Sequence, residues 1–190
     1  MSWPADYTGA WTLHDSVERH GVGLHSGAES RVRLQPSVRP GYWVGWLDAP
    51  QLRLCRLTPA QVRDTRLCTA LQLDQRRLAT VEHLLAALAG VGISSALVLV
   101  DGPEIPLMDG SAQPWVEAIA EVGLKPLGAR CLSPLLEAPI TLQHGQSFVT
   151  ALPSDCLRLA AAIEFPQAAI GRQLYSLELT PQAFVEQIAP

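Results

Sequence analysis

In the first third of the chain, apolar positions alternate with polar ones, which is the period of β-strands. Residues 31–34 alternate arginine with an aliphatic residue, and residues 42–47 are rich in aromatic side chains. Residues 67–73 form a third run with strand-like composition, and prolines and glycines separate the runs. We therefore expect short strands in this part of the chain.

The period changes to that of a helix at Val81. From there apolar residues recur at i, i+3, i+4 and i+7, which predicts a helix over residues 81–89 with Thr80 as its N-cap and Gly90 just past its end. Nearly every side of this segment is apolar, so we expect the helix to be buried between two layers. The apolar run over residues 93–100 predicts a buried strand.

A proline-rich acidic turn over residues 101–109 separates that strand from a second predicted helix, about residues 111–122, which Gly123 ends. Asp109 and Ser111 are suited to cap this helix. In a second interpretation, two acidic residues of the turn do not contact a ligand themselves but orient a residue of a functional site.

The strand pattern starts again after residue 129 and a helix follows it. The sequence LTPA at 57–60 returns as LTPQ at 179–182, which indicates an internal repeat whose second copy stops early. We therefore divide the chain into a first domain, 1–128, and the beginning of a related, incomplete second domain, 129–190. The predicted elements of the second domain are strands at 135–142, 147–152, 157–165 and 174–179, and a helix at 181–188.

The composition is that of a compact globular protein. Hydrophobic residues make up 48% of the 190 residues and charged residues 17%, which excludes a disordered chain. The net charge of −4 favours neither nucleic acid nor an anionic membrane as partner. Residues 84–100 carry no charge, but this run is shorter than the roughly 20 residues that span a bilayer, so we expect no transmembrane segment.

The four cysteines are widely spaced and include no C-x-x-C pair. They indicate reduced thiols in a cytoplasmic protein rather than a disulfide scaffold or a zinc ribbon. Nothing near Cys68 in the sequence marks it as a reactive thiol, so a buried structural cysteine is the simplest interpretation and no nucleophile is proposed.

The pair Glu82–His83 is the most informative feature, because it sets two ionisable side chains in the first turn of an otherwise apolar helix. Burying such groups unpaired costs several kcal/mol, roughly, and a bound metal ion would offset that cost. In that reading His83 is a ligand and Glu82 faces the metal-bound water as general base. In the alternative, Glu82 complements the helix dipole and His83 caps or packs.

The glycine-rich segment 20–27 (HGVGLHSG) has the spacing G-x-G-x-x-x-G and is followed by a predicted strand. A dinucleotide site needs a helix N-terminus at this point, so the glycines are better explained by tight turns or a close approach of the backbone. His25, between two of these glycines, is either a surface turn residue or part of the mouth of a site.

Together these segments resemble the family of UDP-3-O-acyl-N-acetylglucosamine deacetylases. The matching motifs, in the same order and spacing, are HGVGLHSG at 20–27, RDTRLCT at 63–69, TVEHL at 80–84 with AALAG at 86–90, and GPEIPLMDGS at 102–111. A weaker match, IEF at 163–165, extends the similarity over nearly the whole chain.

The resemblance implies an α+β protein with two similar small domains, each a β-sheet with two helices, the helices being sandwiched between the sheets. It implies hydrolysis of the N-acetyl group of a UDP-linked, acylated glucosamine in lipid A biosynthesis, by a monomer that holds Zn²⁺ through two histidines and an aspartate. His83 matches the first zinc ligand and Glu82 the residue that activates the water. Cys68 and His25 match positions in and beside the substrate site, and Phe165 matches an aromatic residue that stacks on the uracil ring.

The chain also departs from the family pattern. The resemblance places the other two zinc ligands, a histidine that protonates the leaving amine and the acyl-chain passage beyond Pro190. His144 is the last histidine, so no later His-x-x-x-Asp pair occurs. Gln146 stands where some members carry a basic residue, and Arg66 replaces an apolar residue.

These departures leave three interpretations open. The first is the zinc amidase itself, given as a fragment, with weak or absent zinc binding and no turnover by these 190 residues alone. The second is a catalytically inactive homologue that acts as a binding or structural module. The third is a purely structural domain in which the Glu–His pair is satisfied without metal. We also expect an exposed apolar face on the incomplete second domain.

Overall fold

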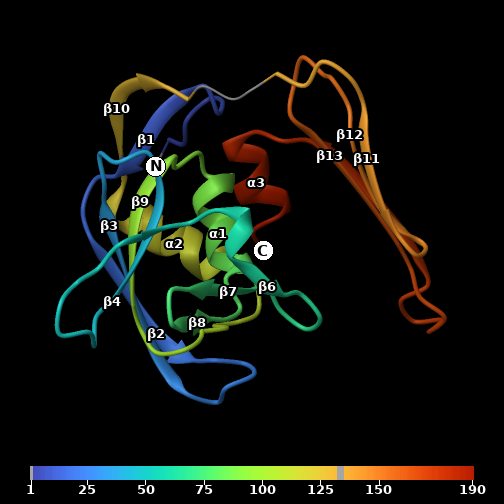
Figure 1. Cartoon of the computed structure of the whole chain (residues 1–190). Helices are drawn as coiled ribbons and strands as arrows, with labels where there is room; N and C mark the ends of the chain where they lie inside the picture. The colour runs from blue at the N-terminus through green and yellow to red at the C-terminus, as the bar shows by residue number, and fades with distance from the viewer. Residues whose placement is uncertain (1, 132–134) are drawn as a thin grey trace. The chain divides into compact units, whose positions relative to one another are not determined.

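The computed structural model describes residues 2–131 and 135–190, and the chain forms two compact units (Figure 1). The first unit contains the residues up to Cys131 together with Pro181–Pro190, and the second contains 135–180. The mixed α and β class expected from the sequence is confirmed. The division at residue 128 stays a prediction, but the final ten residues cluster with the first unit.

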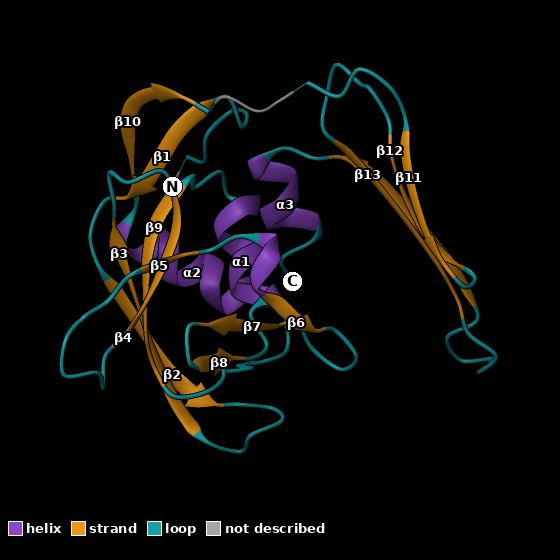
Figure 2. Cartoon of the chain, in the orientation of Figure 1, coloured by secondary structure: helices purple, strands orange, loops and turns teal. Residues whose placement is uncertain are grey.

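A five-stranded sheet is the framework of the first unit (Figure 2). Its central strand runs parallel to one neighbour and antiparallel to the other, and the inner faces of these strands are buried. The predicted strands at 31–34, 42–47 and 93–100 all belong to this sheet. In spatial order its strands are β2 (Val17–Val22), β3 (Glu29–Pro36), β9 (Ser95–Asp101), β4 (Gly41–Trp46) and β5 (Cys55–Arg56).

Two smaller sheets complete the β structure of this unit. Strand β1 (Gly9–Leu13) pairs with β10 (Leu124–Arg130). The other sheet contains β6 (Val62–Asp64), β7 (Ala70–Leu73) and β8 (Arg76–Leu78), and a short 3₁₀ helix, η1 (Pro59–Gln61), precedes it.

The strand expected over 67–73 is wrong in its first half, since β7 begins only at Ala70. The backbone N–H of Thr69 donates a hydrogen bond to Oε2 of Glu82 (3.1 Å) instead of joining a strand ladder. Cys68 therefore lies in the loop before β7 and is half-buried.

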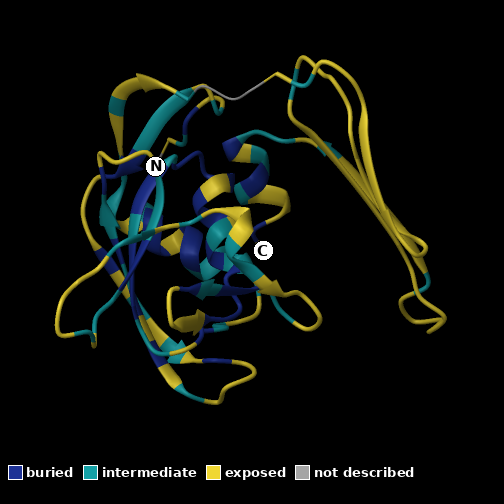
Figure 3. Ribbon diagram, viewed as in Figure 1, coloured by how far each residue is buried: buried dark blue, intermediate teal, exposed yellow. Residues whose placement is uncertain are grey.

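Three helices belong to the first unit: α1 (Glu82–Gly90), α2 (Gln113–Val122) and α3 (Pro181–Gln187). Figure 3 shows that α1 and α2 each contain buried residues alongside intermediate and exposed ones. Trp115 and Ile119 of α2 and Leu88 of α1 are completely buried. The helix α1 is not buried all round, however, because Ala86 and Ala89 are exposed.

Both predicted caps of α1 are wrong. The N-cap position is Val81 and no side chain caps it, because Thr80 adopts a left-handed conformation (φ 56°) and its hydroxyl bonds Glu104. Gly90 is the last residue of the helix, and the left-handed glycine is Gly92 (φ 88°). At the start of α2, Ala112 is the N-cap without a side-chain cap, although Ser111 Oγ accepts a hydrogen bond from the N–H of Gln113 (3.1 Å).

Gly90 is required for the packing of α3, because a Cβ at this position would overlap the ring of Phe184. We expect Gly90→Ala to lower the free energy of unfolding by about 1–3 kcal/mol, the usual cost of overpacking a core. Chemical denaturation measures this change.

The control is to make Gly90→Ala in a protein that already carries Phe184→Ala. Without the ring, Gly90→Ala is expected to be neutral or stabilising by up to about 1 kcal/mol, because alanine favours a helix more than glycine does. Equal destabilisation in both backgrounds would contradict this explanation.

The second unit consists of two β-hairpins in separate sheets: β11 (Ile140–His144) with β12 (Ser147–Ala151), and β13 (Arg158–Glu164) with β14 (Arg172–Glu178). These strands agree with the predicted ones, except that β11 begins at Ile140 rather than 135. Many apolar side chains on them are exposed, but they point to both sides of the hairpins, as the consecutive residues Phe148 and Val149 do, so a single exposed apolar face stays a prediction. Examples of these exposed side chains are Leu142, Phe148, Val149, Ile163 and Leu174.

Every helix among the described residues is too short or too polar to cross a lipid bilayer.

Candidate functional site

Glu82 and His83 form the first turn of α1 and line one cavity of about 360 Å³ within the first unit. The predicted catalytic base and the predicted metal ligand therefore reach the same space. The other lining residues come from α1, from the start of α2 and from the end of the chain, and they are Ala86, Gly110, Ser111, Ala112, Phe184, Ile188 and Pro190.

The carboxylate of Glu82 is held by the loop that carries Cys68. Its Oε2 accepts a hydrogen bond from the N–H of Thr69 (3.1 Å), and the carbonyl of Thr69 accepts one from the N–H of Val81 (3.3 Å). The position of Glu82 in the first helical turn is also favourable to a negative charge. The orienting role of Thr69 was missed in the sequence, because a backbone amide leaves no signal in residue type.

His83 is half-buried and lies close to Asp109. The pKa of Asp109 is lowered, first by hydrogen bonds from the backbone N–H (2.9 Å) and hydroxyl (2.8 Å) of Ser111, and to a smaller extent by the charge of His83. Asp109 itself does not line the cavity, although the next two residues, Gly110 and Ser111, do.

Glu104 agrees in its contacts with the second interpretation of the acidic turn, in which a carboxylate orients a site residue, but that role stays a prediction. Its side chain is only 1% exposed and accepts hydrogen bonds from the backbone N–H of His25 (3.1 Å), the backbone N–H of Ser26 (2.7 Å) and the hydroxyl of Thr80 (2.6 Å). Burial raises the pKa of Glu104, but the hydrogen bonds from Thr80, Ser26 and His25 outweigh it and bring the pKa to about 2. Asp101 instead pairs with Arg31 (3.1 Å).

The glycine motif is a tight loop, as expected, and not a nucleotide cradle. A Cβ on Gly23 would overlap the carboxyl group of Glu104, and Gly27 has a φ of 62°. Strand β3 follows the loop, so the loop does not open a helix. His25 is exposed on this loop, and its backbone connects it to Glu104.

The first unit thus contains four of the five predicted site residues. Glu82 and His83 line one cavity, Cys68 precedes the amide that holds Glu82, and His25 is linked through Glu104 to the residue two positions before Glu82. Phe165 follows β13 in the second unit and is 47% exposed. The roles of all five residues stay predictions.

Comparison with known proteins decides the family. The family model described as LpxC, UDP-3-O-acyl N-acetylglycosamine deacetylase, matches residues 10–190. The chain belongs to the LpxC family.

Individual relatives agree with this LpxC assignment. The chain is 41% identical over 185 residues to the UDP-3-O-acyl-N-acetylglucosamine deacetylase of a Nostoc species, which covers 94% of this chain and 66% of the relative. It is 41% identical over 180 residues to the protein of that name from Thermosynechococcus vestitus, and 39% over 182 residues to that from Vibrio cholerae. The match covers 94% of this chain in both cases, and 62% and 60% of these two relatives. The chain therefore spans slightly less than two thirds of the length of these curated relatives.

The donors of this LpxC chain fit a zinc ion in part. A catalytic zinc ion takes three protein ligands and keeps a fourth position for water or substrate. His83 supplies an imidazole at the cavity, and Glu82 supplies a carboxylate. Within residues 2–131 and 135–190, no group of three or more histidine, cysteine or acidic side chains is placed to hold a metal ion.

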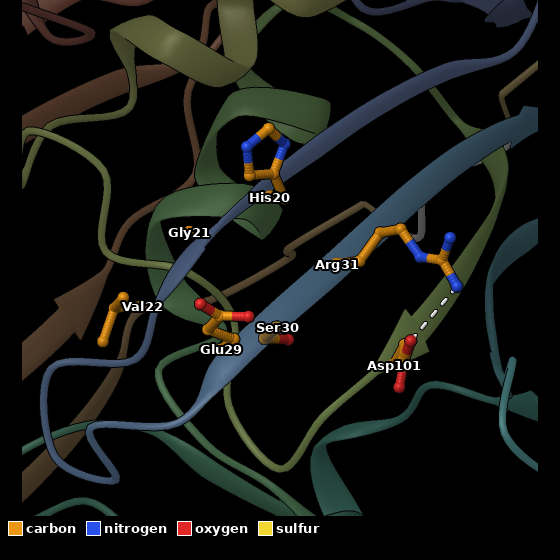
Figure 4. A pocket seen from close by; sticks show the side chains of 7 residues that line it. All are labelled: His20, Gly21, Val22, Glu29, Ser30, Arg31 and Asp101. Carbon is orange, nitrogen blue, oxygen red and sulfur yellow. Dashed lines mark hydrogen bonds and ion pairs between the residues drawn. The ribbon is translucent and has the colours of Figure 1, made fainter.

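A larger cavity of about 570 Å³ lies elsewhere in this LpxC chain, on β2, β3 and β9 (Figure 4). Figure 4 shows His20 on one strand beside Arg31 on the next, with Arg31 paired to Asp101. None of the five predicted site residues lines this cavity. Its charged groups largely pair with one another, so we base no function on it.

Proposed function

We propose that this chain takes part in the zinc-dependent hydrolysis of the N-acetyl group of UDP-3-O-(3-hydroxyacyl)-N-acetylglucosamine, which releases acetate in cytoplasmic lipid A biosynthesis. The names of the relatives support the substrate and the reaction. The observation that carries the proposal is the placement of an imidazole and an oriented carboxylate, His83 and Glu82, at one cavity.

In this mechanism His83 contributes one ligand to the zinc ion. When bound, zinc supplies Lewis-acid polarisation of the amide carbonyl and a lower pKa for the attacking water. Glu82 accepts the proton of that water as general base. Because Oε2 already accepts the N–H of Thr69, the proton goes to Oε1.

The remaining predicted residues are assigned to substrate binding. Cys68 precedes the amide that holds Glu82, so its side chain is suited to line the space beside the reacting amide. His25 contributes from the edge of the site through the loop that Glu104 holds. The exposed aromatic ring of Phe165 is suited to stack on the uracil ring.

Titration with Zn²⁺ tests the metal part of the proposal. We expect the 190-residue chain to bind zinc weakly, since His83 is its only proposed ligand, and His83→Ala to weaken binding by at least about tenfold. His144→Ala is the matched control, because His144 lies on an exposed strand of the second unit.

Two outcomes for His83→Ala would contradict the proposed metal site. Equal zinc affinity of wild type and His83→Ala would contradict a ligand role. If His83→Ala changed only the free energy of unfolding, the Glu82–His83 pair would be structural.

A second candidate function is that of a catalytically inactive homologue, a binding or structural domain. It needs no metal site, and no group of three or more ligating side chains is found among the described residues. A protein of the relatives' length that contains these 190 residues and binds the UDP-sugar, but releases no acetate in the presence of zinc, would support this candidate.

A further inference from the structure

We infer that Glu104 is a positioning residue for the Glu82–His83 pair. Its one buried carboxylate holds both the glycine loop 23–27 and Thr80, which lies two residues before the start of α1. This inference rests on the proposed function of the pair. Glu104 lies on the turn after β9 and does not line the cavity itself.

On one side, Glu104 holds the glycine loop. The N–H groups of His25 and Ser26 point at its carboxylate, and the loop closes through hydrogen bonds from the N–H of Gly23 to Ala28 (2.9 Å) and from the N–H of Gly27 to Gly23 (3.0 Å). The loop can come this close only because position 23 has no side chain.

On the other side, Glu104 holds Thr80 in a conformation that the backbone disfavours. A β-branched residue at φ 56° is a true outlier, and such strain persists only where the surroundings enforce it. The hydroxyl of Thr80 bonds Oε1 of Glu104 at 2.6 Å. Backbone bonds from the N–H of Ala79 to Pro103 and from the N–H of Ile105 to Ala79, both 3.0 Å, lock the two segments together.

The backbone conformation of Thr80, two residues before Glu82, sets the direction in which α1 begins and therefore where Glu82 and His83 lie. The chain turns sharply at Thr80 and enters the helix at once, without a side-chain cap. The hold on Thr80 therefore sets the position of the first turn of α1.

An ionised carboxylate satisfies this arrangement best. The two N–H groups and, here, the hydroxyl all donate, and an ionised glutamate is an acceptor at both oxygens. Glutamine at position 104 would keep the shape but has one neutral acceptor oxygen, so its NH₂ group would face either the two N–H groups or the hydroxyl of Thr80, which would then have to accept. Glu104→Gln is thus expected to weaken the hold on both the loop and Thr80.

The experiment uses the 190-residue chain and solution NMR. It compares wild type, Glu104→Gln, Thr80→Gly and the double variant. Glu29→Gln is the control, because Glu29 is an exposed glutamate at the start of β3, just after the glycine loop. The readouts are hydrogen exchange of the His25 and Ser26 amides, and the chemical shifts of the Thr69 amide and the His83 imidazole.

For Glu104→Gln we expect amide exchange at His25 and Ser26 to rise by about tenfold or more, because hydrogen bonds to a charged group are lost. We also expect the Thr69 and His83 signals to move. Glycine adopts a positive φ without strain. Thr80→Gly in the Glu104→Gln background should therefore return the Thr69 and His83 signals toward wild type while the loop amides stay unprotected.

A purely structural Glu104 would lower stability but leave the Thr69 and His83 signals of the folded protein unchanged, and this result would overturn the inference. If Glu104→Gln does not fold, Thr80→Val takes its place, since it only replaces the hydroxyl by a methyl group. Its expected result is moved Thr69 and His83 signals with protected loop amides, and unmoved signals would again overturn the inference. None of these readouts needs turnover, so a failure of the deacetylase proposal is seen separately, as an unchanged rate of acetate release when Glu82→Gln is placed in a deacetylase-active protein that contains these 190 residues.

Discussion

Glu82→Gln is expected to lower the rate of acetate release by about 10²–10⁴-fold in a deacetylase-active protein that contains these 190 residues. Glutamine keeps the shape of the side chain and can still accept the N–H of Thr69, but it cannot take a proton from water at neutral pH. The zinc content should not change, because His83 and not Glu82 is the proposed ligand. Steady-state kinetics and metal analysis on the same preparation measure both quantities.

Glu117→Gln is the matched control, because Glu117 is exposed on α2 outside the cavity. Its rate should equal that of wild type. A Glu82→Gln rate within a few-fold of wild type would contradict the general-base role, and a loss of zinc with the activity would make Glu82 a ligand instead.

Acidification is expected to remove on the order of 3 kcal/mol of unfolding free energy through Glu104 alone. The pKa of this carboxyl falls from its ordinary 4.5 to about 2 in the folded protein. The stabilisation is therefore complete above pH 4.5, and it is lost as the pH falls toward 2, because the unfolded chain binds the proton first. Denaturant unfolding at several pH values between about 6 and 2 measures the slope.

Glu104→Gln provides the comparison, since glutamine does not titrate in this range. The variant should be less stable at neutral pH and should depend less steeply on pH. The difference in stability between the two proteins should narrow as the pH approaches 2. If the unfolding free energies of the two proteins ran parallel over the whole pH range, the hydrogen bonds to Glu104 would not lower its pKa in the folded protein.

The exposed carboxylates with lowered pKa values are expected to matter less. Asp109, for example, is held by the backbone and hydroxyl of Ser111 at the surface, where solvent screens its interactions. The acid dependence should therefore follow the buried Glu104.

The sequence was most informative where an element depends on neighbouring residues. The apolar period from Val81 predicted α1 to within about one residue at each end, and the continuous run at 93–100 predicted the central strand of the main sheet. The ordered motifs gave the resemblance to the family that the comparisons show. Strands β1 and β10 had no such period and became strands through pairing with each other.

The sequence by itself determined the elements with a clear period, the family, and the Glu82–His83 pair as the candidate site. Only the tertiary structure decided that Thr80 is a left-handed residue tied to Glu104 rather than an N-cap, and that Gly90 makes room for Phe184 rather than ending the helix. The physical reason is distance along the chain. A helical period is set by residues three and four positions apart, whereas Glu104 bonds partners 24 to 79 residues away, which no local pattern records.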